Sequence, residues 1–216
     1  MFQEISKAVI EGQAPLVEEL IKKALCEGSS PDELIRNSLI TGMAVVGERF
    51  KKNEFYVPEV LIAARAMKRG LAILEPLLTE HGLEPVATLL IGTVQGDLHD
   101  IGKNLVAMMF EGAGFRVIDL GIDVKPAQFV ETVETYKPEI VALSALLTTT
   151  MPAMMETIDS LMASGLREQV KVIVGGAPVT GNYASEIGAD GYAPDASSAV
   201  DKAKELLGID IAASYL

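Results

Sequence analysis

The hydrophobic period of the sequence changes near residue 86, and this change constrains the fold more than any other feature. Before it, apolar residues recur at helical spacing, as on one face of an amphipathic helix. After it, short apolar runs alternate with helical stretches, which is typical of a chain that repeats a strand and a helix. The intervening residues 81–85, His-Gly-Leu-Glu-Pro, interrupt both patterns. We therefore expect a helical domain over residues 1–82, a linker over 83–85 and an α/β domain over 86–210.

The first part predicts a small antiparallel four-helix bundle. Gly12 and Gly28 end the first two helical patterns. Ser30-Pro31-Asp32-Glu33 begins the third, with a capping serine, a proline in the first helical position and acids in the first turn. That helix is expected to continue to Phe50, and Val57-Pro58-Glu59 opens the fourth.

The second part predicts a doubly wound, flavodoxin-like or Rossmann-like domain with a five-stranded parallel sheet. In this fold, the loops after the first, third and fourth strands form the ligand-binding edge, where the strand order reverses. Helices are expected at about residues 101–112, 125–136, 152–164, 180–188 and 195–207. The expected strands cover residues 87–91, 115–120, 139–143, 171–174 and 191–193.

Composition excludes several classes of function. The chain has 18 basic and 30 acidic residues and a net charge of −12, so binding to a phosphate backbone is not expected. It has no tryptophan and few aromatic residues, which argues against a base-stacking surface. The single cysteine, Cys26, excludes a disulfide framework and is expected to be a buried or half-buried apolar residue. Without a signal peptide or a membrane-length apolar run, the protein is expected to be cytoplasmic.

Three polar or glycine-rich loops follow the strands that should form the binding edge. The first is Gly96 to Asn104, which holds Asp97 and His99. The second is Ser144 to Thr150, and the third contains Gly175-Gly176. No Walker loop and no Gly-x-Gly-x-x-Gly follows the first strand. The histidine and aspartate could serve as a general base, although no nucleophile elbow is present to need one.

These loops resemble a known signature. Asp97-Leu98-His99-Asp100-Ile101-Gly102, Ser144-Ala145-Leu146 and Gly175-Gly176 are similar to the Asp-x-His-x-x-Gly, Ser-x-Leu and Gly-Gly motifs of cobalamin-binding domains. Each motif follows a predicted strand, and the three occur in order. Together they form a much more specific pattern than any one of them alone.

The helical part carries a second resemblance. Gly42-Met43, Val46-Gly47-Glu48-Arg49-Phe50 and Phe55-Tyr56-Val57-Pro58-Glu59 resemble the helical cap module of methionine synthase and of corrinoid proteins. Over about residues 2–208, the chain resembles the corrinoid proteins of methylamine, methanol, glycine betaine and aryl-ether demethylation systems. The methionine synthase resemblance is to its cobalamin-binding module, because the chain is too short for the complete enzyme.

The resemblance implies roles for particular residues. His99 matches the lower axial ligand of cobalt, Asp97 the carboxylate that bonds the other imidazole nitrogen, and Thr150 the hydroxyl that completes the relay. The cofactor-binding positions also include the motif residues Gly96, Leu98, Asp100 and Gly102. Those implied for the nucleotide tail are Ser144, Leu146, Thr148, Gly175, Gly176 and Ala196, and Tyr56 and Val57 match cap residues over the methyl-bearing face of the corrin.

The resemblance also implies a function. A cobalamin or related corrinoid would cycle between methylcob(III)alamin and cob(I)alamin, so the protein would carry a methyl group rather than act as a complete enzyme. The implied partners are a substrate-specific methyltransferase, a second methyltransferase that acts on a thiol or folate-type acceptor, and a reductive activator. No nucleic acid or membrane is implied.

Two other classes remain as alternatives. The small subunit of an adenosylcobalamin-dependent mutase uses the same histidine motif but usually lacks the helical cap. A cobalamin-dependent gene regulator would need a DNA-binding module, and the acidic helical part supplies no basic stripe.

Overall fold

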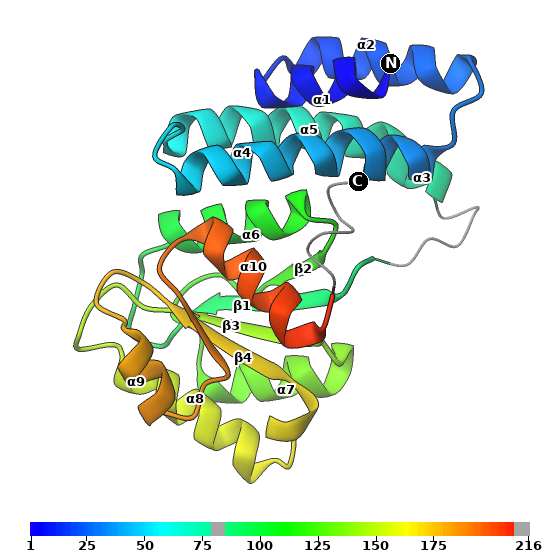
Figure 1. Cartoon of the computed structure of the whole chain (residues 1–216). Helices are drawn as coiled ribbons and strands as arrows, with labels where there is room; N and C mark the ends of the chain where they lie inside the picture. The colour runs from blue at the N-terminus through cyan, green and yellow to red at the C-terminus, as the bar shows by residue number, and fades with distance from the viewer. Residues whose placement is uncertain (79–84, 210–216) are drawn as a thin grey trace. The chain divides into compact units, whose positions relative to one another are not determined.

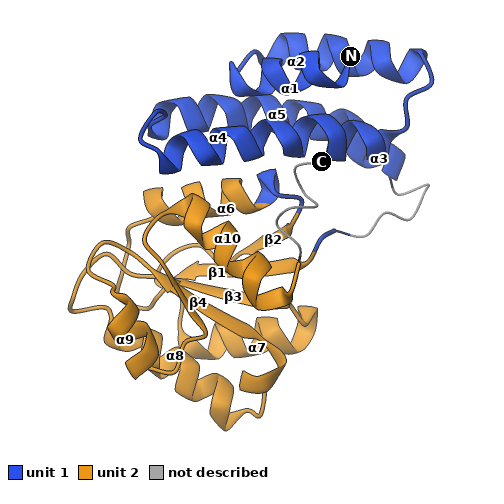
Figure 2. Ribbon diagram, viewed as in Figure 1, with its two compact units in different colours: residues 1–86, 111–114, 214–216 blue, residues 87–110, 115–213 orange. Residues whose placement is uncertain are grey.

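The computed structural model describes residues 1–78 and 85–209. Its described part divides into two compact units (Figure 2). Among the described residues, unit 1 contains 1–78, 85–86 and 111–114, and unit 2 contains 87–110 and 115–209. Residues 83 and 84 of the predicted linker lie outside the described residues.

Unit 1 is helical, as the spacing of its apolar residues predicts. The helices pack through their apolar faces, and residues such as Ile5, Ile21, Leu39 and Leu74 are completely buried. Its elements are α1 (Phe2–Ile10), α2 (Ala14–Cys26), α3 (Pro31–Leu34), η1 (Ile35–Ile40), α4 (Thr41–Lys51) and α5 (Val57–Leu78).

The predicted third helix is interrupted by the π-helical segment η1. Ser30 caps its start, and the Glu33 side chain accepts from the Ser30 backbone N–H, which completes a capping box. The Ser38 hydroxyl donates to the Leu34 carbonyl, while the Ser38 carbonyl accepts from the Ser6 hydroxyl at 2.9 Å. These side-chain bonds engage backbone carbonyls and locally compete with regular α-helical geometry. The periodicity of the apolar residues carries no signal for such a bulge.

The expectation for Cys26 is wrong. Cys26 is the last residue of α2 and its side chain is exposed, whereas Ile21 and Ala24 of the same helix are buried. The helical pattern correctly placed the cysteine on α2 but not on its solvent side.

Unit 2 contains a parallel sheet in the order β2-β1-β3-β4-β5. This is the predicted doubly wound arrangement, and the order reverses between β1 and β3. β1 lies between β2 and β3, so its carboxyl end faces loops from both sides. The strands are β1 (Thr88–Thr93), β2 (Arg116–Asp119), β3 (Ile140–Ser144), β4 (Lys171–Gly175) and β5 (Gly191–Ala193).

Helices cover both faces of this sheet, with α6 and α10 on one face and α7, α8 and α9 on the other (Figure 1). Phe129 of α7 and Ile158 of α8 belong to a core that also contains Leu90, Val141 and Val172 of the sheet. The helices are α6 (Ile101–Gly112), α7 (Pro126–Tyr136), α8 (Pro152–Ala163), α9 (Gly181–Glu186) and α10 (Ala196–Leu207), and a short 3-10 helix, η2 (Arg167–Gln169), precedes β4.

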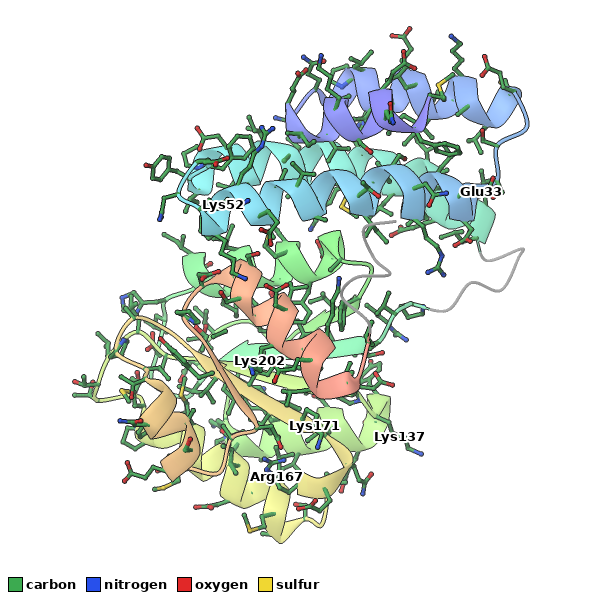
Figure 3. The ribbon with its side chains drawn as sticks, in the orientation of Figure 1. Glu33, Lys52, Lys137, Arg167, Lys171 and Lys202 are labelled. Atoms are coloured by element: carbon green, nitrogen blue, oxygen red, sulfur yellow. The ribbon has the colours of Figure 1, made fainter. Side chains whose placement is uncertain are left out.

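The amino end of β4 is held by Arg167. Its guanidinium donates to the carbonyls of Val170 and Gly188, at 3.2 and 2.6 Å, and pairs with Asp190 at 2.8 Å. Figure 3 labels Arg167 near Lys171, the first residue of β4. This network holds the start of β4 to the turn before β5, at the end of these strands opposite the polar loops.

No helix in the described part combines the length and apolarity needed to cross a lipid bilayer.

Candidate functional site

The loop between β1 and α6 carries His99, whose imidazole is held in place by the carboxylate of Asp97. The Asp97 carboxylate is fully buried, whereas half of the His99 side chain is exposed. Asp97 Oδ1 lies 2.7 Å from His99 Nδ1 and accepts from the His99 backbone N–H at 3.1 Å. An ionised carboxylate only accepts hydrogen bonds, so Nδ1 carries a proton, and in the neutral imidazole Nε2 keeps its lone pair. The exposed imidazole can therefore bind an electrophile or metal through Nε2.

The second carboxylate oxygen of Asp97 connects this loop to the β3–α8 loop. Asp97 Oδ2 accepts from the Leu146 backbone N–H at 2.8 Å and from the Thr150 hydroxyl at 2.7 Å. The Leu147 carbonyl lies 2.9 Å from the same hydroxyl, which has only one proton to donate. Thr150 thus has two alternative acceptors, one charged and one neutral.

These contacts set the charge of Asp97. Burial raises the pKa of its carboxyl group, but the hydrogen bonds from Thr150, from the Leu146 amide and from His99 outweigh burial and lower the pKa well below its usual range. Asp97 is therefore a carboxylate at neutral pH. It orients the imidazole, as carboxylates do for metal-ligating histidines.

The backbone of the histidine loop is also held. The buried Thr93 hydroxyl donates to the His99 carbonyl at 2.9 Å. From the β2–α7 loop, the Asp123 carboxylate accepts from the Gly96 N–H at 2.7 Å, and the Asp123 N–H donates to the Asp97 carbonyl at 3.0 Å. His99 is thus presented from a loop whose backbone is fixed on several sides.

The glycine pair after β4 allows a close approach of two loops. Gly176 has φ +133°, and a Cβ atom there would lie 1.8 Å from the Ala145 carbonyl oxygen. At this position only glycine combines the backbone conformation with the available space. The β4–α9 loop is consequently pressed against the β3–α8 loop that carries Leu146 and Thr150.

Around the imidazole, the same edge exposes large apolar side chains. Leu98 and Ile101 are 67% and 76% exposed, and Leu146 and Leu147 are also exposed. A Cβ atom at Gly102 would meet no other atom within 4 Å, so space is open beside the start of α6. Exposed apolar groups around a fixed polar group are typical of a ligand site. These exposed apolar side chains and the His99 imidazole would fit a large, largely apolar metal macrocycle that takes a nitrogen ligand.

The other residues predicted for the site are placed as follows. Ser144 ends β3, half-buried, in register with Thr93 of β1 and Gly175 of β4. Thr148 is exposed in the β3–α8 loop. Ala196 is buried at the start of α10.

Asp100 precedes α6, and its carboxylate accepts from the Asn104 side-chain amide at 3.0 Å. Tyr56 and Val57 belong to unit 1, at the start of α5. The Tyr56 N–H donates to Glu59 at 2.9 Å, and its ring is largely exposed. Its side chain is thus available for contact, within a unit separate from the histidine loop.

Sequence reasoning missed Asp123 and the ion pair of the buried Lys103 with the exposed Asp119. Lys103 is 2% exposed, and its ammonium group binds Asp119 at 2.5 Å and the Asn104 side chain at 2.7 Å, which joins α6 to the end of β2. Both aspartates lie in or beside the loop after the second strand. The polar residues at the end of the second strand were the available signal. In doubly wound folds, however, ligands are expected at the loops after the first, third and fourth strands, so this loop was not considered.

Comparison with known proteins agrees with this geometry. A model of the B12 binding domain matches residues 87–201, and a second B12 binding domain model matches residues 1–75. A corrinoid protein of Desulfitobacterium hafniense is 43% identical over 211 residues, which cover 96% of this chain and 98% of that protein. The trimethylamine corrinoid protein of Methanosarcina barkeri is 43% identical over 94% of both chains.

Among solved structures, a chain of the methanol:cobalamin methyltransferase complex of Methanosarcina barkeri superposes with a TM-score of 0.84 and 31% identity. The match covers 95% of this chain and 78% of that chain. Domain models, full-length relatives and fold all agree, and the chain belongs to the family of B12-binding corrinoid proteins.

Proposed function

We propose that this protein carries a methyl group on the cobalt of a bound cobalamin or related corrinoid, between two methyltransferases. The observation that supports this role most directly is the Asp97–His99 pair. In this pair the buried Asp97 carboxylate is hydrogen-bonded to His99 Nδ1, which would leave Nε2 of the half-exposed ring to bind cobalt. A bound corrinoid would supply a cobalt centre able to accept and release a methyl group.

The residues of the chain would then bind, orient and tune that centre. His99 would provide a nitrogen ligand for the cobalt, and Asp97 would keep the imidazole in the tautomer with Nε2 unprotonated. Thr150 donates to Asp97 and thereby stabilises the charged carboxylate. The Leu147 carbonyl at 2.9 Å is a second acceptor for the Thr150 hydroxyl, so this hydroxyl could turn away from Asp97 if the charge of the carboxylate were neutralised.

The binding edge gives the remaining proposed contacts. We assign Gly96, Leu98, Asp100 and Gly102 to the lower face of the cofactor, around His99. For its nucleotide tail we assign the residues from the other carboxyl-end loops. These are Ser144, Leu146, Thr148, Gly175, Gly176 and Ala196.

The helical unit would serve as a cap. Tyr56 and Val57 would contact the reactive face of the cofactor, and methyl transfer would require that face to be uncovered. Residues 81–85 are the proposed hinge, and 81–84 of them lie outside the described residues. Helical residues 1–82, the linker 83–85 and the α/β residues 86–210 are the proposed functional division.

The proposed partners follow from the same scheme. A substrate-specific methyltransferase would methylate the cofactor, and a second would transfer the methyl group to a thiol or folate-type acceptor. A reductive activator would restore the cofactor after oxidation. The similar methanol:cobalamin methyltransferase complex supports the first of these partners. The mutase-subunit alternative is less well supported, because the helical unit matches its own B12 binding domain model.

A transfer assay tests this function. Protein reconstituted with cobalamin and reduced should acquire an isotopically labelled methyl group from a methylated amine or methanol when its genetically neighbouring methyltransferase is added. Mass spectrometry of the extracted cofactor measures the transfer. Asp159→Asn, a change on the exposed face of α8, is the control variant and should acquire the label as the wild type does. An active methyltransferase that methylates free cobalamin but never the protein-bound cofactor would contradict the proposal.

A further inference from the structure

The β2–α7 loop reaches across to the histidine loop through one residue, Asp123. Its carboxylate accepts from the Gly96 N–H at 2.7 Å, and its own N–H donates to the Asp97 carbonyl at 3.0 Å. The two bonds hold the Gly96–Asp97 segment at both of its ends. That segment ends at the carboxylate that orients His99.

The backbone conformation of Asp123 supports a specific role. Its φ is +54°, in the left-handed region that non-glycine residues rarely adopt and that aspartate tolerates better than most. Such a conformation is maintained where the surroundings over-determine it. Here the next residue, Val124, is buried and its N–H donates to the Thr93 carbonyl at 3.0 Å, which fixes the register of the two loops.

These two hydrogen bonds of Asp123 are important because the orientation of the imidazole depends on Asp97. The carboxylate oxygens of Asp97 are fixed by Leu146, Thr150 and His99. Its main-chain N–H donates to the Val94 carbonyl at 3.1 Å within the same loop, and its carbonyl is held from the neighbouring loop by Asp123. A shift of the Gly96–Asp97 segment would stretch the Asp97 Oδ1 to His99 Nδ1 contact of 2.7 Å. Sites of this kind tolerate displacements of only about 0.5 Å.

We propose that Asp123 is a positioning residue for the axial ligand: it holds the Gly96–Asp97 segment so that Asp97 keeps His99 in its Nδ1-protonated form. The inference rests on the proposed function for its link to cobalt. The hydrogen-bond geometry that it concerns exists in the protein without cofactor.

Two substitutions separate the carboxylate from the backbone conformation. Asp123→Gly keeps the left-handed conformation at no steric cost, and it keeps the N–H bond to the Asp97 carbonyl, but it removes the acceptor for Gly96. Asp123→Asn retains an oxygen acceptor and also tolerates the left-handed region. Only the glycine variant should therefore release the segment.

The first measurement uses cofactor-free protein. Nitrogen-15 NMR of the His99 ring, at a pH where the imidazole is neutral, should show the Nδ1-protonated tautomer in the wild type and in Asp123→Asn. Asp123→Gly should show a mixture of tautomers. In the wild type, the Gly96 amide should exchange with solvent more slowly than the Gln95 amide, a comparison that needs no variant. A wild-type tautomer in Asp123→Gly, or unprotected Gly96, would overturn the proposal.

The second measurement adds methylcobalamin. Asp123→Gly should bind it about tenfold more weakly and with less histidine coordination, as for loss of an outer-shell partner. Asp123→Asn should remain close to wild type. Wild-type binding and coordination in Asp123→Gly would overturn the link to cobalt. If wild-type protein itself lacks histidine coordination, the proposed ligation fails, while the tautomer measurement still decides the role of Asp123.

Discussion

Gly176→Ala is expected to destabilise the α/β unit by about 3 kcal/mol or more, through backbone strain and overpacking together. The new Cβ atom would lie 1.8 Å from the Ala145 carbonyl oxygen, and φ is +133°. Neither atom belongs to a flexible side chain, so the two loops would have to separate. Denaturant unfolding followed by circular dichroism measures the change in the free energy of unfolding.

Gly165→Ala is the matched control for this prediction. Gly165 also has a positive φ, +71°, but a Cβ atom there meets nothing within 4 Å. Strain without a clash should cost about 1 kcal/mol. Equal losses in the two variants would show that the contact between Gly176 and Ala145 is not the constraint that we describe.

Asp97→Asn is expected to weaken histidine ligation while leaving the fold intact. Both carboxylate oxygens accept from donors, so an amide NH2 group in either position would face a donor. If it faces His99 Nδ1, the imidazole must accept there and carry its proton on Nε2, which then cannot bind cobalt. We expect methylcobalamin affinity to fall about 10- to 100-fold, the usual effect of losing an outer-shell partner.

The same variant should change how stability depends on pH. Because the pKa of Asp97 is lower in the folded protein than in the unfolded chain, the unfolded state binds this proton first as the pH falls. The contribution of Asp97 is fully present above the unfolded pKa of about 4 and is lost as the pH falls through the folded pKa. Unfolding free energies of wild type and Asp97→Asn should therefore converge in acid. Parallel curves down to low pH would contradict a depressed pKa, and Asp159→Asn controls for the change in net charge.

Periodicity and turn chemistry predicted the fold closely where local signals are strong. The expected range 191–193 coincides with β5, and 101–112 coincides with α6. Parallel strands connected by helices permit few topologies, so the βα repeat led to the doubly wound parallel sheet that is observed. The π-helical segment at Ile35–Ile40 and the exposure of Cys26 were not predicted, because both depend on tertiary contacts rather than on period.

The candidate site shows the same division. The order of motifs led to Asp97, His99 and Thr150, and the structure brings their side chains within hydrogen-bond distance. The hydrogen bonds from the Leu146 N–H to Asp97 and from the Gly96 N–H to Asp123 were not predicted. Every residue except proline has a backbone N–H, so the residue type does not indicate which N–H groups donate to a site. Such contacts require coordinates for two loops that are distant in sequence.

The absorbance spectrum of methylcobalamin bound to the wild type and to His99→Ala tests the central claim most directly. The protein should bind the cofactor with a histidine-coordinated spectrum, and the alanine variant should shift it to the form without a lower nitrogen ligand. The variant should remain folded, because the His99 side chain is half exposed and its loss leaves Asp97 with its bonds from Leu146 and Thr150. Identical spectra for the two proteins, or a wild-type spectrum without nitrogen coordination, would contradict the assignment of His99 as the cobalt ligand.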